Sequence, residues 1–279
     1  MDFSKDITTI AGELQGASLD ELAVSSLITT TGHKIEVTNS FQKEKWYTGI
    51  TYLLQDKLSG HNVCPWATDS CREVCLGTHS GHARMIKGGN KTNHVQAARL
   101  KRTIMYFNFR EEFLNGLRKE LNSLVRKAEK KGVKPAFRFN GSSDLSFEKS
   151  GIMEEYPNIM FYDYTKSFHR MTNFLDGDLP ENYHLTFSYT PENEDKASLI
   201  LAMGGNVAVV FDERSTTKHA PTFIGRQFLG HEIITGDEHD LRFLDPKGGY
   251  VVGLTKKGHQ KNKAFFISVD RTTKAAEAA

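Results

Sequence analysis

Five short apolar segments, from residue 134 onward, restrict the folds that this chain can adopt. They are rich in β-branched and aromatic side chains and cover residues 134–140, 159–165, 184–189, 207–212 and 250–255. Helical patterns at residues 146–155 and 193–203 separate some of them. Because strands that alternate with crossover segments pair in parallel, we expect an α/β fold, a partial (β/α) barrel of mostly parallel strands.

The rest of the chain adds elements at both ends of this series. Residues 34–37 alternate and residues 48–54 are rich in strand formers, which predicts an N-terminal β-hairpin. Residues 95–131 repeat apolar side chains at helical spacing, and residues 221–244 predict a late β insertion, a hairpin or meander. The expected organisation is an N-terminal arm (1–26), a single barrel-like domain that carries the cysteines (27–270) and a disordered tail (271–279).

Composition excludes several classes of protein. The chain is 38% hydrophobic, and its longest apolar run, residues 199–211, is interrupted by Gly204 and Gly205, so no membrane span is expected. Residues 1–20 lack the apolar core of a secretory signal, which predicts a cytoplasmic protein. The formal charge of +2 predicts no strong nucleic-acid-binding patch from bulk charge alone.

All three cysteines of the chain, Cys64, Cys71 and Cys75, lie within twelve consecutive positions, residues 64–75. Disulfide frameworks use an even number of cysteines spread along an exported chain, so this cluster does not suit one. If a helix begins near Glu73, Cys71 and Cys75 share one of its faces, and Cys64 reaches them from the preceding loop. Three thiolates that converge in this way suit a metal ion or an iron–sulfur cluster.

The identity of that metal centre is left open by the cysteines. A [4Fe–4S] cluster held by three cysteines leaves one iron without a protein thiolate, and this open site can take substrate or cofactor. Zinc would need a fourth protein ligand, for which His61, His79 and His82 are the candidates. The alternative is three unrelated thiols, since free cysteine is usually buried and inert.

Polar side chains follow the apolar segments, at the ends where parallel α/β folds gather their chemistry. In the first segment Arg138 and Asn140 share one face and Phe137 and Phe139 the other. We therefore expect the aromatic side chains to pack under helices and the polar ones to point into the mouth of the barrel.

The loop at residues 140–144 is the strongest single candidate for ligand binding. Its glycine lets the backbone approach a ligand, and Ser143 and Asp144 can donate and accept hydrogen bonds, although both could also cap the next helix. Asn140, Ser143, Asp144 and Ser188 are predicted to line a cofactor or substrate pocket.

Three further residues at the strand ends, Asp163, Lys166 and Asp212, are predicted to position substrate or to move protons. The alternative is that Arg138, Asp163 and Asp212 form an interior ion-pair network that only orders the fold. Later in the chain, Arg242 is expected to pair with an acid.

Several strings, read in order, resemble one bacteriophage family, labelled gene product eighty-eight. They are Cys-Pro-x-Ala-x-x-x-Cys-x-x-x-Cys-Leu from Cys64, Arg-x-Asn-Gly-x-Ser-Asp from Arg138, Tyr-Asp-Tyr-Thr-Lys, Ser-Tyr and Arg-Phe-Leu-Asp-Pro. The resemblance runs from Cys64 to about Gly258 and implies a phage or prophage origin and a protein of the host-cell cytoplasm.

More distantly, the layout resembles that of radical S-adenosylmethionine enzymes, partial (β/α) barrels whose first strand leads into a loop with three cysteines. The resemblance implies a [4Fe–4S] cluster on Cys64, Cys71 and Cys75, whose open iron binds the methionine part of S-adenosylmethionine. It also implies that residues 140–144 contact the amino group of that cofactor. The cysteines here are spaced more widely than in that superfamily.

Three functional hypotheses follow. The first is an iron–sulfur enzyme that acts on a small molecule or nucleotide, by radical S-adenosylmethionine chemistry. The second keeps the cluster without the radical step, as a Lewis acid in a hydrolase or lyase or as a structural group. The third is a module with zinc or a cluster that binds host protein or nucleic acid through basic residues of 84–102 and 118–134.

Overall fold

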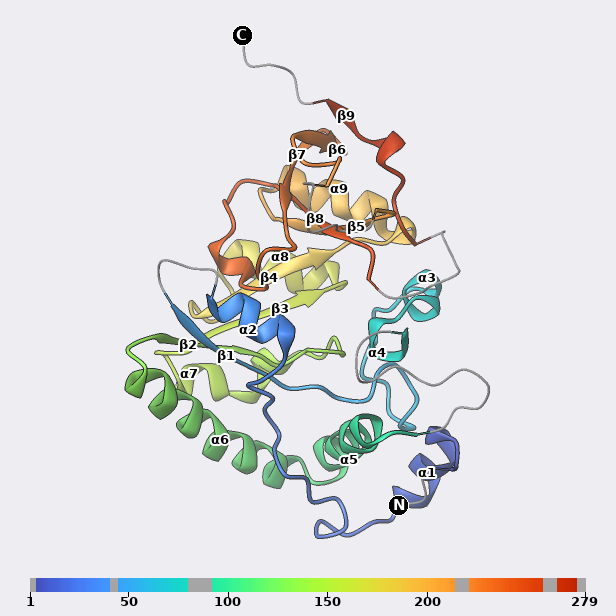
Figure 1. Ribbon diagram of the computed structural model, residues 1–279, viewed down its shortest axis with the longest axis vertical. Helices are drawn as coiled ribbons and strands as arrows, with labels where there is room; N and C mark the ends of the chain where they lie inside the picture. The colour runs from blue at the N-terminus through green and yellow to red at the C-terminus, as the bar shows by residue number, and fades with distance from the viewer. Residues whose placement is uncertain (1–3, 41–44, 80–91, 214–220, 258–264, 275–279) are drawn as a thin grey trace.

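One mixed sheet organises the chain in the computed structural model, which describes residues 4–40, 45–79, 92–213, 221–257 and 265–274 (Figure 1). Its strand order is β1-β2-β3-β4-β5-β8-β7-β6-β9. The strands are β1 (Trp46–Ile50), β2 (Lys134–Arg138), β3 (Met160–Thr165), β4 (Tyr183–Ser188), β5 (Val207–Phe211), β6 (Arg226–Phe228), β7 (His231–Thr235), β8 (Val251–Thr255) and β9 (Thr273–Lys274).

Parallel pairing runs through most of this sheet. Every pair from β1 to β5, and β5–β8 and β8–β7, is parallel, whereas β6 pairs antiparallel with β7 and β9. The expectation of an α/β fold with a mostly parallel sheet is confirmed, and the five apolar segments match β2, β3, β4, β5 and β8. The sheet is open, with β1 and β9 at its two edges, so the predicted barrel is not confirmed.

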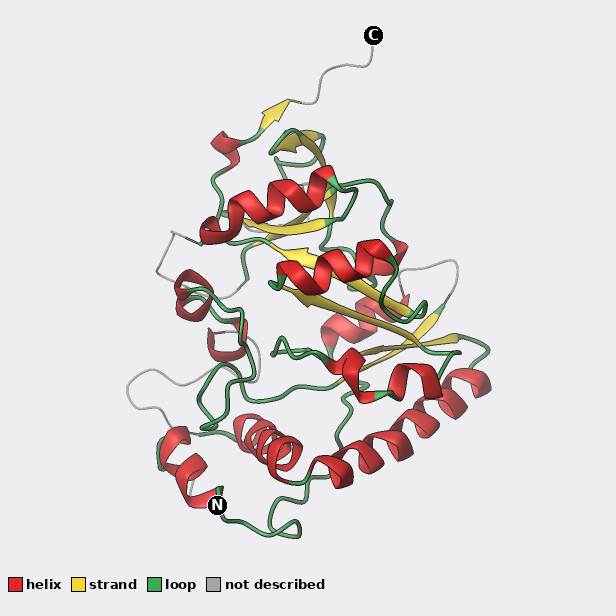
Figure 2. Ribbon diagram, turned by 180° about the vertical axis from the view of Figure 1, so that it is seen from behind, coloured by secondary structure: helices red, strands yellow, loops and turns green. Residues whose placement is uncertain are grey.

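Four helices between β1 and β5 lie on one face of the sheet. They are α6 (Arg110–Lys130), α7 (Ile152–Glu155), α8 (Phe168–Asp176) and α9 (Glu194–Ala202), accompanied by the 3-10 turns η2 (Phe147–Ser150) and η3 (Pro191–Asn193), and α5 (His94–Asn108) packs against α6. Figure 2 shows α6 to α9 in front of the strands. Consecutive parallel strands joined by crossovers of one hand place their helices on one side in this way.

The apolar core explains why α6 lies on that side. Its buried residues Leu117, Leu121 and Leu124 follow helical spacing. They pack in the same core as Phe137, which lies in β2, and Phe139, which directly follows that strand. The predicted alternation is therefore confirmed on its aromatic side. Because Gly49 of β1 has no side-chain carbon, Ile28, Leu124 and Phe137 pack directly over the strand.

The predicted N-terminal hairpin is wrong. Residues 34–37 belong to a helix, α2 (His33–Ser40), and in the part of the chain that the structure describes a single antiparallel bridge, Thr29 to Ile50, involves β1. Ile35 and Thr38 are both buried. Three positions apart on a helix, they share a face, so packing against β1 decides the structure over local strand preference.

Both ends of the chain contain regular structure among the described residues. Helix α1 (Ile7–Leu14), capped by Asp6, packs with Leu100 and Ile104 of α5 in a second apolar cluster. At the other end, η5 (Val269–Arg271) is followed by β9, which pairs with β6. Residues 275–279 of the expected tail lie outside the described residues.

The late β insertion is present as the β6–β7 hairpin. The segment that follows it, with η4 (Arg242–Leu244), packs against the first strands: the Phe243 ring lies 4.9 Å from that of Trp46. Arg242 forms the expected ion pair, with Asp245 at 3.3 Å. Among the described residues, no helix has the length and apolar character needed to cross a bilayer.

Candidate functional site

The loop at residues 64–75, called the cysteine loop below, is joined by hydrogen bonds to the loop that follows β2. The chain continues from β1 to Asp56, whose carbonyl accepts from Val63. The carbonyl of Val63 in turn accepts from the backbone N–H of Asp144 at 2.8 Å, and the Cys64 thiol lies 3.8 Å from the carbonyl of Ser142. The loops after the first two strands therefore form one unit at the C-terminal edge of the sheet, called the mouth below.

Helix α3 (Asp69–Glu73) positions Cys71 in this unit. The Thr68 side chain caps the helix by accepting from the backbone N–H of Cys71. Glu192, in the turn after β4, accepts from the backbone N–H and the hydroxyl of Ser70 at 3.0 and 2.7 Å. The expected helix start at Glu73 is wrong, since α3 ends there and Cys75 lies before α4 (Leu76–His79). Cys71 and Cys75 thus do not share a helix face.

The three thiols nevertheless lie within electrostatic range of one another. Each is half-buried, and no disulfide links them. Burial, together with the Cys75 and Cys71 thiols, raises the pKa of the Cys64 thiol to about 12. Burial and Cys71 also raise the pKa of Cys75. Without a bound cation the arrangement therefore favours neutral thiols, and it would favour thiolates only beside a positive group or a metal.

Lys166, the first residue after β3, supplies a positive group at this place. Its ammonium donates to the Ser188 hydroxyl at 2.9 Å and is hydrogen-bonded to the Cys71 side chain. Burial lowers the pKa of Lys166, but Cys71, Asp144 and Cys64 raise it, and the net shift is upward. The lysine is therefore held as an ammonium between two thiols and a carboxylate.

Asp144 connects the lysine to a second buried cation. One of its oxygens accepts from the backbone N–H of Lys166 at 2.8 Å, and the other accepts from Arg170 at 2.6 Å. Arg170 also binds both oxygens of Glu148 at 2.8 Å and is 3% exposed. Burial raises the pKa of Asp144, while Arg170 and the bond from Lys166 lower it, with a net rise. These pairs order the wall of the mouth.

Hydrogen bonds between Asn140 and Asp163 hold the loop after β2 in place. The carboxylate of Asp163 accepts from the backbone and the side chain of Asn140 at 2.7 and 3.0 Å, and from Tyr183 at 3.1 Å. The Asn140 side-chain oxygen accepts from Ser143 at 2.8 Å and from the backbone of Leu145. Burial raises the pKa of Asp163 to about 7, against the lowering by Arg138 and Asn140.

The predicted residues therefore fall into two groups. Six are brought together through the hydrogen bonds given above: Asn140, Ser143, Asp144, Asp163, Lys166 and Ser188. Asp163 is 1% exposed and fully engaged, so its position is that of a brace for the loop. Asp212, in contrast, is exposed and pairs with Lys256 at 3.0 Å at the end of β5.

The residues of the mouth can be compared with what a metal centre needs. Among the described residues, no three His, Cys, Asp or Glu side chains are close enough together to hold a single metal ion. His61 stacks on Phe107 with ring centroids 4.4 Å apart, and His82 lies outside the described residues. Three thiols are the donor set that a cluster with one open iron would need.

Several residues of the site carry no signal that sequence reasoning used. Glu192 and Arg170 reach the mouth from segments with no recognised motif. Arg99 and Tyr52 are a further pair: the guanidinium lies 4.7 Å from the centroid of the tyrosine ring. For Arg99, the sequence pattern that could indicate burial is its place at helical spacing among the apolar residues of α5. Arg99 and Arg102 are both only 9% exposed, so neither belongs to an exposed basic surface.

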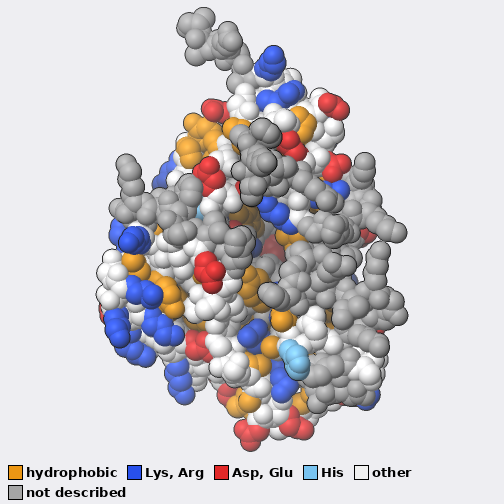
Figure 3. All heavy atoms as spheres, in the orientation of Figure 1, with side chains coloured by type: hydrophobic (Ala, Val, Ile, Leu, Met, Phe, Trp, Pro, Cys, Tyr) orange, Lys and Arg blue, Asp and Glu red, His pale blue; other side chains and the backbone are white. Residues whose placement is uncertain are grey.

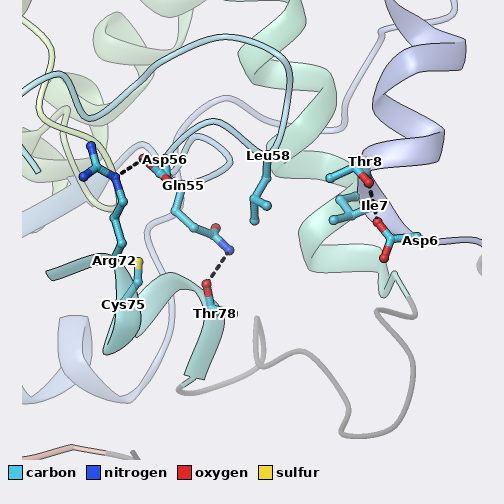
Figure 4. Close-up of a pocket in the computed structure, with 9 residues that line it drawn as sticks. All are labelled: Asp6, Ile7, Thr8, Gln55, Asp56, Leu58, Arg72, Cys75 and Thr78. Atoms are coloured by element: carbon cyan, nitrogen blue, oxygen red, sulfur yellow. Dashed lines mark hydrogen bonds and ion pairs between the residues drawn. The ribbon is translucent and has the colours of Figure 1, made fainter. Parts of the chain in front are cut away.

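A pocket of about 170 Å³ adjoins the cysteine loop. Figure 4 shows Cys75 and Arg72 on one side of it and Ile7 and Thr8 of α1 on the other. Within its wall Arg72 pairs with Asp56 at 3.1 Å and Gln55 donates to Thr78 at 3.1 Å. On the face seen in Figure 1, the surface is hollowed near its middle, and acidic and basic side chains lie inside the hollow (Figure 3).

Comparison with known proteins gives one match. A family model described as gene product 88 matches residues 25–270. No curated protein and no solved structure matches the chain.

Proposed function

The chain belongs to the gene product 88 family, and from that premise we propose that it is an iron–sulfur enzyme with its active site at the mouth. In this proposal Cys64, Cys71 and Cys75 hold a [4Fe–4S] cluster. The substrate is a small molecule or nucleotide that binds beside the cluster. A phage origin and action in the host-cell cytoplasm are part of the same proposal.

The observation that carries the proposal is the contact of Lys166 with the Cys71 thiol, with Cys64 and Cys75 in electrostatic range. Three neutral thiols need no buried cation, whereas three thiolates on a cluster bring negative charge that is costly to bury uncompensated. Lys166 supplies the opposite charge and a hydrogen-bond donor. Hydrogen bonds to the sulfurs and local charge are also what set the potential of such clusters.

With three cysteine ligands, one iron would lack a protein thiolate, and the group would then offer an open coordination site to substrate or cofactor. The chain itself would do the rest. Ser188 and Asp144 hold the ammonium of Lys166 in place, and Asp163 fixes the loop at residues 140–144. Lys166 would bind or orient the substrate and is the residue best placed to deliver a proton.

Radical chemistry with S-adenosylmethionine is the finer form of the proposal. What supports it is the order of parts: a first parallel strand that leads into the cysteine loop, and a sheet whose first five strands are parallel and lie side by side in chain order. A cluster that acts without the radical step has the same ligands. The two differ in whether S-adenosylmethionine is cleaved.

The test begins with protein purified without oxygen. About four irons and labile sulfide per chain, with a brown colour, are expected. Single Cys→Ser variants at positions 64, 71 and 75 should each lose most of the iron, while Ser142→Ala, beside Cys64, should keep it. A colourless protein with one zinc, or iron that survives all three cysteine variants, would overturn the proposal.

Turnover then separates the two kinds of chemistry. The reduced protein is incubated with S-adenosylmethionine, and 5′-deoxyadenosine is measured. Release of 5′-deoxyadenosine supports the radical form. An intact, reduced cluster that leaves S-adenosylmethionine uncleaved removes that form and keeps the iron–sulfur enzyme.

A further inference from the structure

Arg99 of α5 is a buried cation with no acidic partner among the described residues. It is 9% exposed, and its Nε and Nη1 atoms are buried without a hydrogen-bond partner. The groups that act on its charge are Tyr52, Arg102 and Cys75, none of which is a carboxylate. A buried guanidinium with two idle N–H groups costs free energy unless something else accepts from it.

Arg102, one turn further along the same helix, is a buried arginine whose side chain has a hydrogen-bond acceptor. It is also 9% exposed, and its Nε and Nη2 atoms both donate to the carbonyl of Ser26, at 2.9 and 2.7 Å. The fold can therefore provide acceptors for a buried arginine on α5. It provides none to these two nitrogens of Arg99 among the described residues.

Three features place Arg99 at the mouth. Its guanidinium lies over the ring of Tyr52, which follows β1 on the way to the cysteine loop, and it interacts electrostatically with Cys75. Cys75 also lines the pocket of Figure 4. The tyrosine ring itself is held by the loop after β2, because a side chain at Gly141 would lie 2.6 Å from it. The guanidinium thus lies over an aromatic ring, while its Nε and Nη1 atoms have no acceptor among the described residues.

We infer that Arg99 is the anchor of an oxyanion subsite, where its guanidinium donates to a carboxylate or phosphate group of the substrate. The inference rests on the proposed function in taking the mouth as the site of chemistry, and it narrows the substrate to an anion. Guanidinium groups bind both oxyanions through paired N–H donors, so the two sources share one chemistry.

The test measures binding of inorganic phosphate and of acetate to the full chain by calorimetry and by the midpoint of thermal unfolding. One or both should bind wild type and raise the midpoint. Arg99→Gln should weaken that binding about tenfold or more, and Arg99→Lys should restore only part of it, because lysine lacks the fork of donors. Binding of acetate alone indicates a carboxylate substrate, and binding of phosphate alone a phosphorylated one.

Arg102→Gln is the matched control. It should lower the unfolding midpoint and leave the anion affinity of the folded protein near that of wild type. Arg99→Gln should leave the midpoint without anion unchanged or raised, since it removes an unpaired buried charge. The inference is overturned if Arg99→Gln lowers the midpoint as Arg102→Gln does, or if wild type and Arg99→Gln bind both anions equally.

Iron content of the same samples separates this inference from the proposed function. Arg99→Gln should keep the iron of wild type. Loss of iron with unchanged anion binding would make Arg99 a residue that holds the cluster and would overturn the subsite. Wild type without iron but with Arg99-dependent anion binding would instead contradict the cluster and retain the subsite.

Discussion

The ammonium of Lys166 is hydrogen-bonded to the side chain of Cys71, although β3 and the cysteine loop are far apart in the sequence. The contact joins the only cysteine-bearing segment to the polar end of a central strand. It depends on two tethers: Ser188, which accepts from the lysine, and Glu192, which holds Ser70 next to Cys71. Replacing Lys166 therefore changes the charge at the mouth, and the effect on a bound cluster can be measured.

Lys166→Met should make the proposed cluster harder to reduce. Reduction adds a negative charge, and the variant removes the nearest cation, so the potential should become more negative while the iron content is retained. A redox titration followed by visible absorption measures this. Lys256→Met, which removes the lysine paired with Asp212 at the end of β5, is the control and should leave the potential unchanged. Equal potentials in all three proteins would contradict the assignment of Lys166.

Arg170→Met should destabilise the fold severely. The arginine is 3% exposed and pairs with Asp144 and Glu148, so the variant removes the cation that both buried carboxylates bind directly. Breaking a buried pair in this way costs about 3–5 kcal/mol in the free energy of unfolding, measured with urea. The comparison is Arg118→Met, whose pair with Glu155 is exposed and should contribute at most about 1 kcal/mol. Similar losses in the free energy of unfolding for the two variants would show that the ion pairs of Arg170 contribute little to stability.

Gly141→Ala should also be destabilising, through crowding. An added methyl group would lie 2.7 Å from the carbonyl oxygen of Thr51 and 2.6 Å from the Tyr52 ring, and the backbone cannot move away cheaply. Overpacking of this kind costs about 1–3 kcal/mol. Gly12→Ala, in α1, meets nothing within 4 Å and should instead stabilise by up to about 1 kcal/mol. Urea unfolding of both variants checks the opposite signs.

Local patterns in the sequence predict the central sheet well and the edges poorly. Each of the segments from β2 to β5 is apolar and bounded by breakers, so its identity depends little on context. Residues 34–37 alternate as a strand does, but the burial of Ile35 and Thr38 against β1 makes them helical. A packing choice of this kind depends on a partner strand that the pattern does not contain.

For the site, residues that follow recognisable strands could be predicted, and those that complete the electrostatics could not. Asn140, Asp144 and Lys166 are predicted from their place at strand ends, where parallel α/β folds gather their chemistry, and their role in a site remains a proposal. Arg99 is not predicted, because a buried arginine on a helix has the same pattern as a surface one. Asp163 was identified from its position, yet its three acceptor contacts, which make it a brace, come from residues brought together only by folding.

His184, near the start of β4, should make the fold sensitive to acid. Burial lowers its pKa to about 4, with Lys247 and Arg242 adding to the effect. The folded state then binds fewer protons than the unfolded state between about pH 6.5 and 4, so stability falls as the pH is lowered through this window. At pH 5 the loss from this one group is about 2 kcal/mol relative to pH 7.5.

His184→Phe keeps a ring against Phe174 and should remove that part of the loss in urea unfolding at the two pH values. Replacement of the exposed His169 by phenylalanine should leave the loss as in wild type, and an equal loss in His184→Phe would contradict the role of His184.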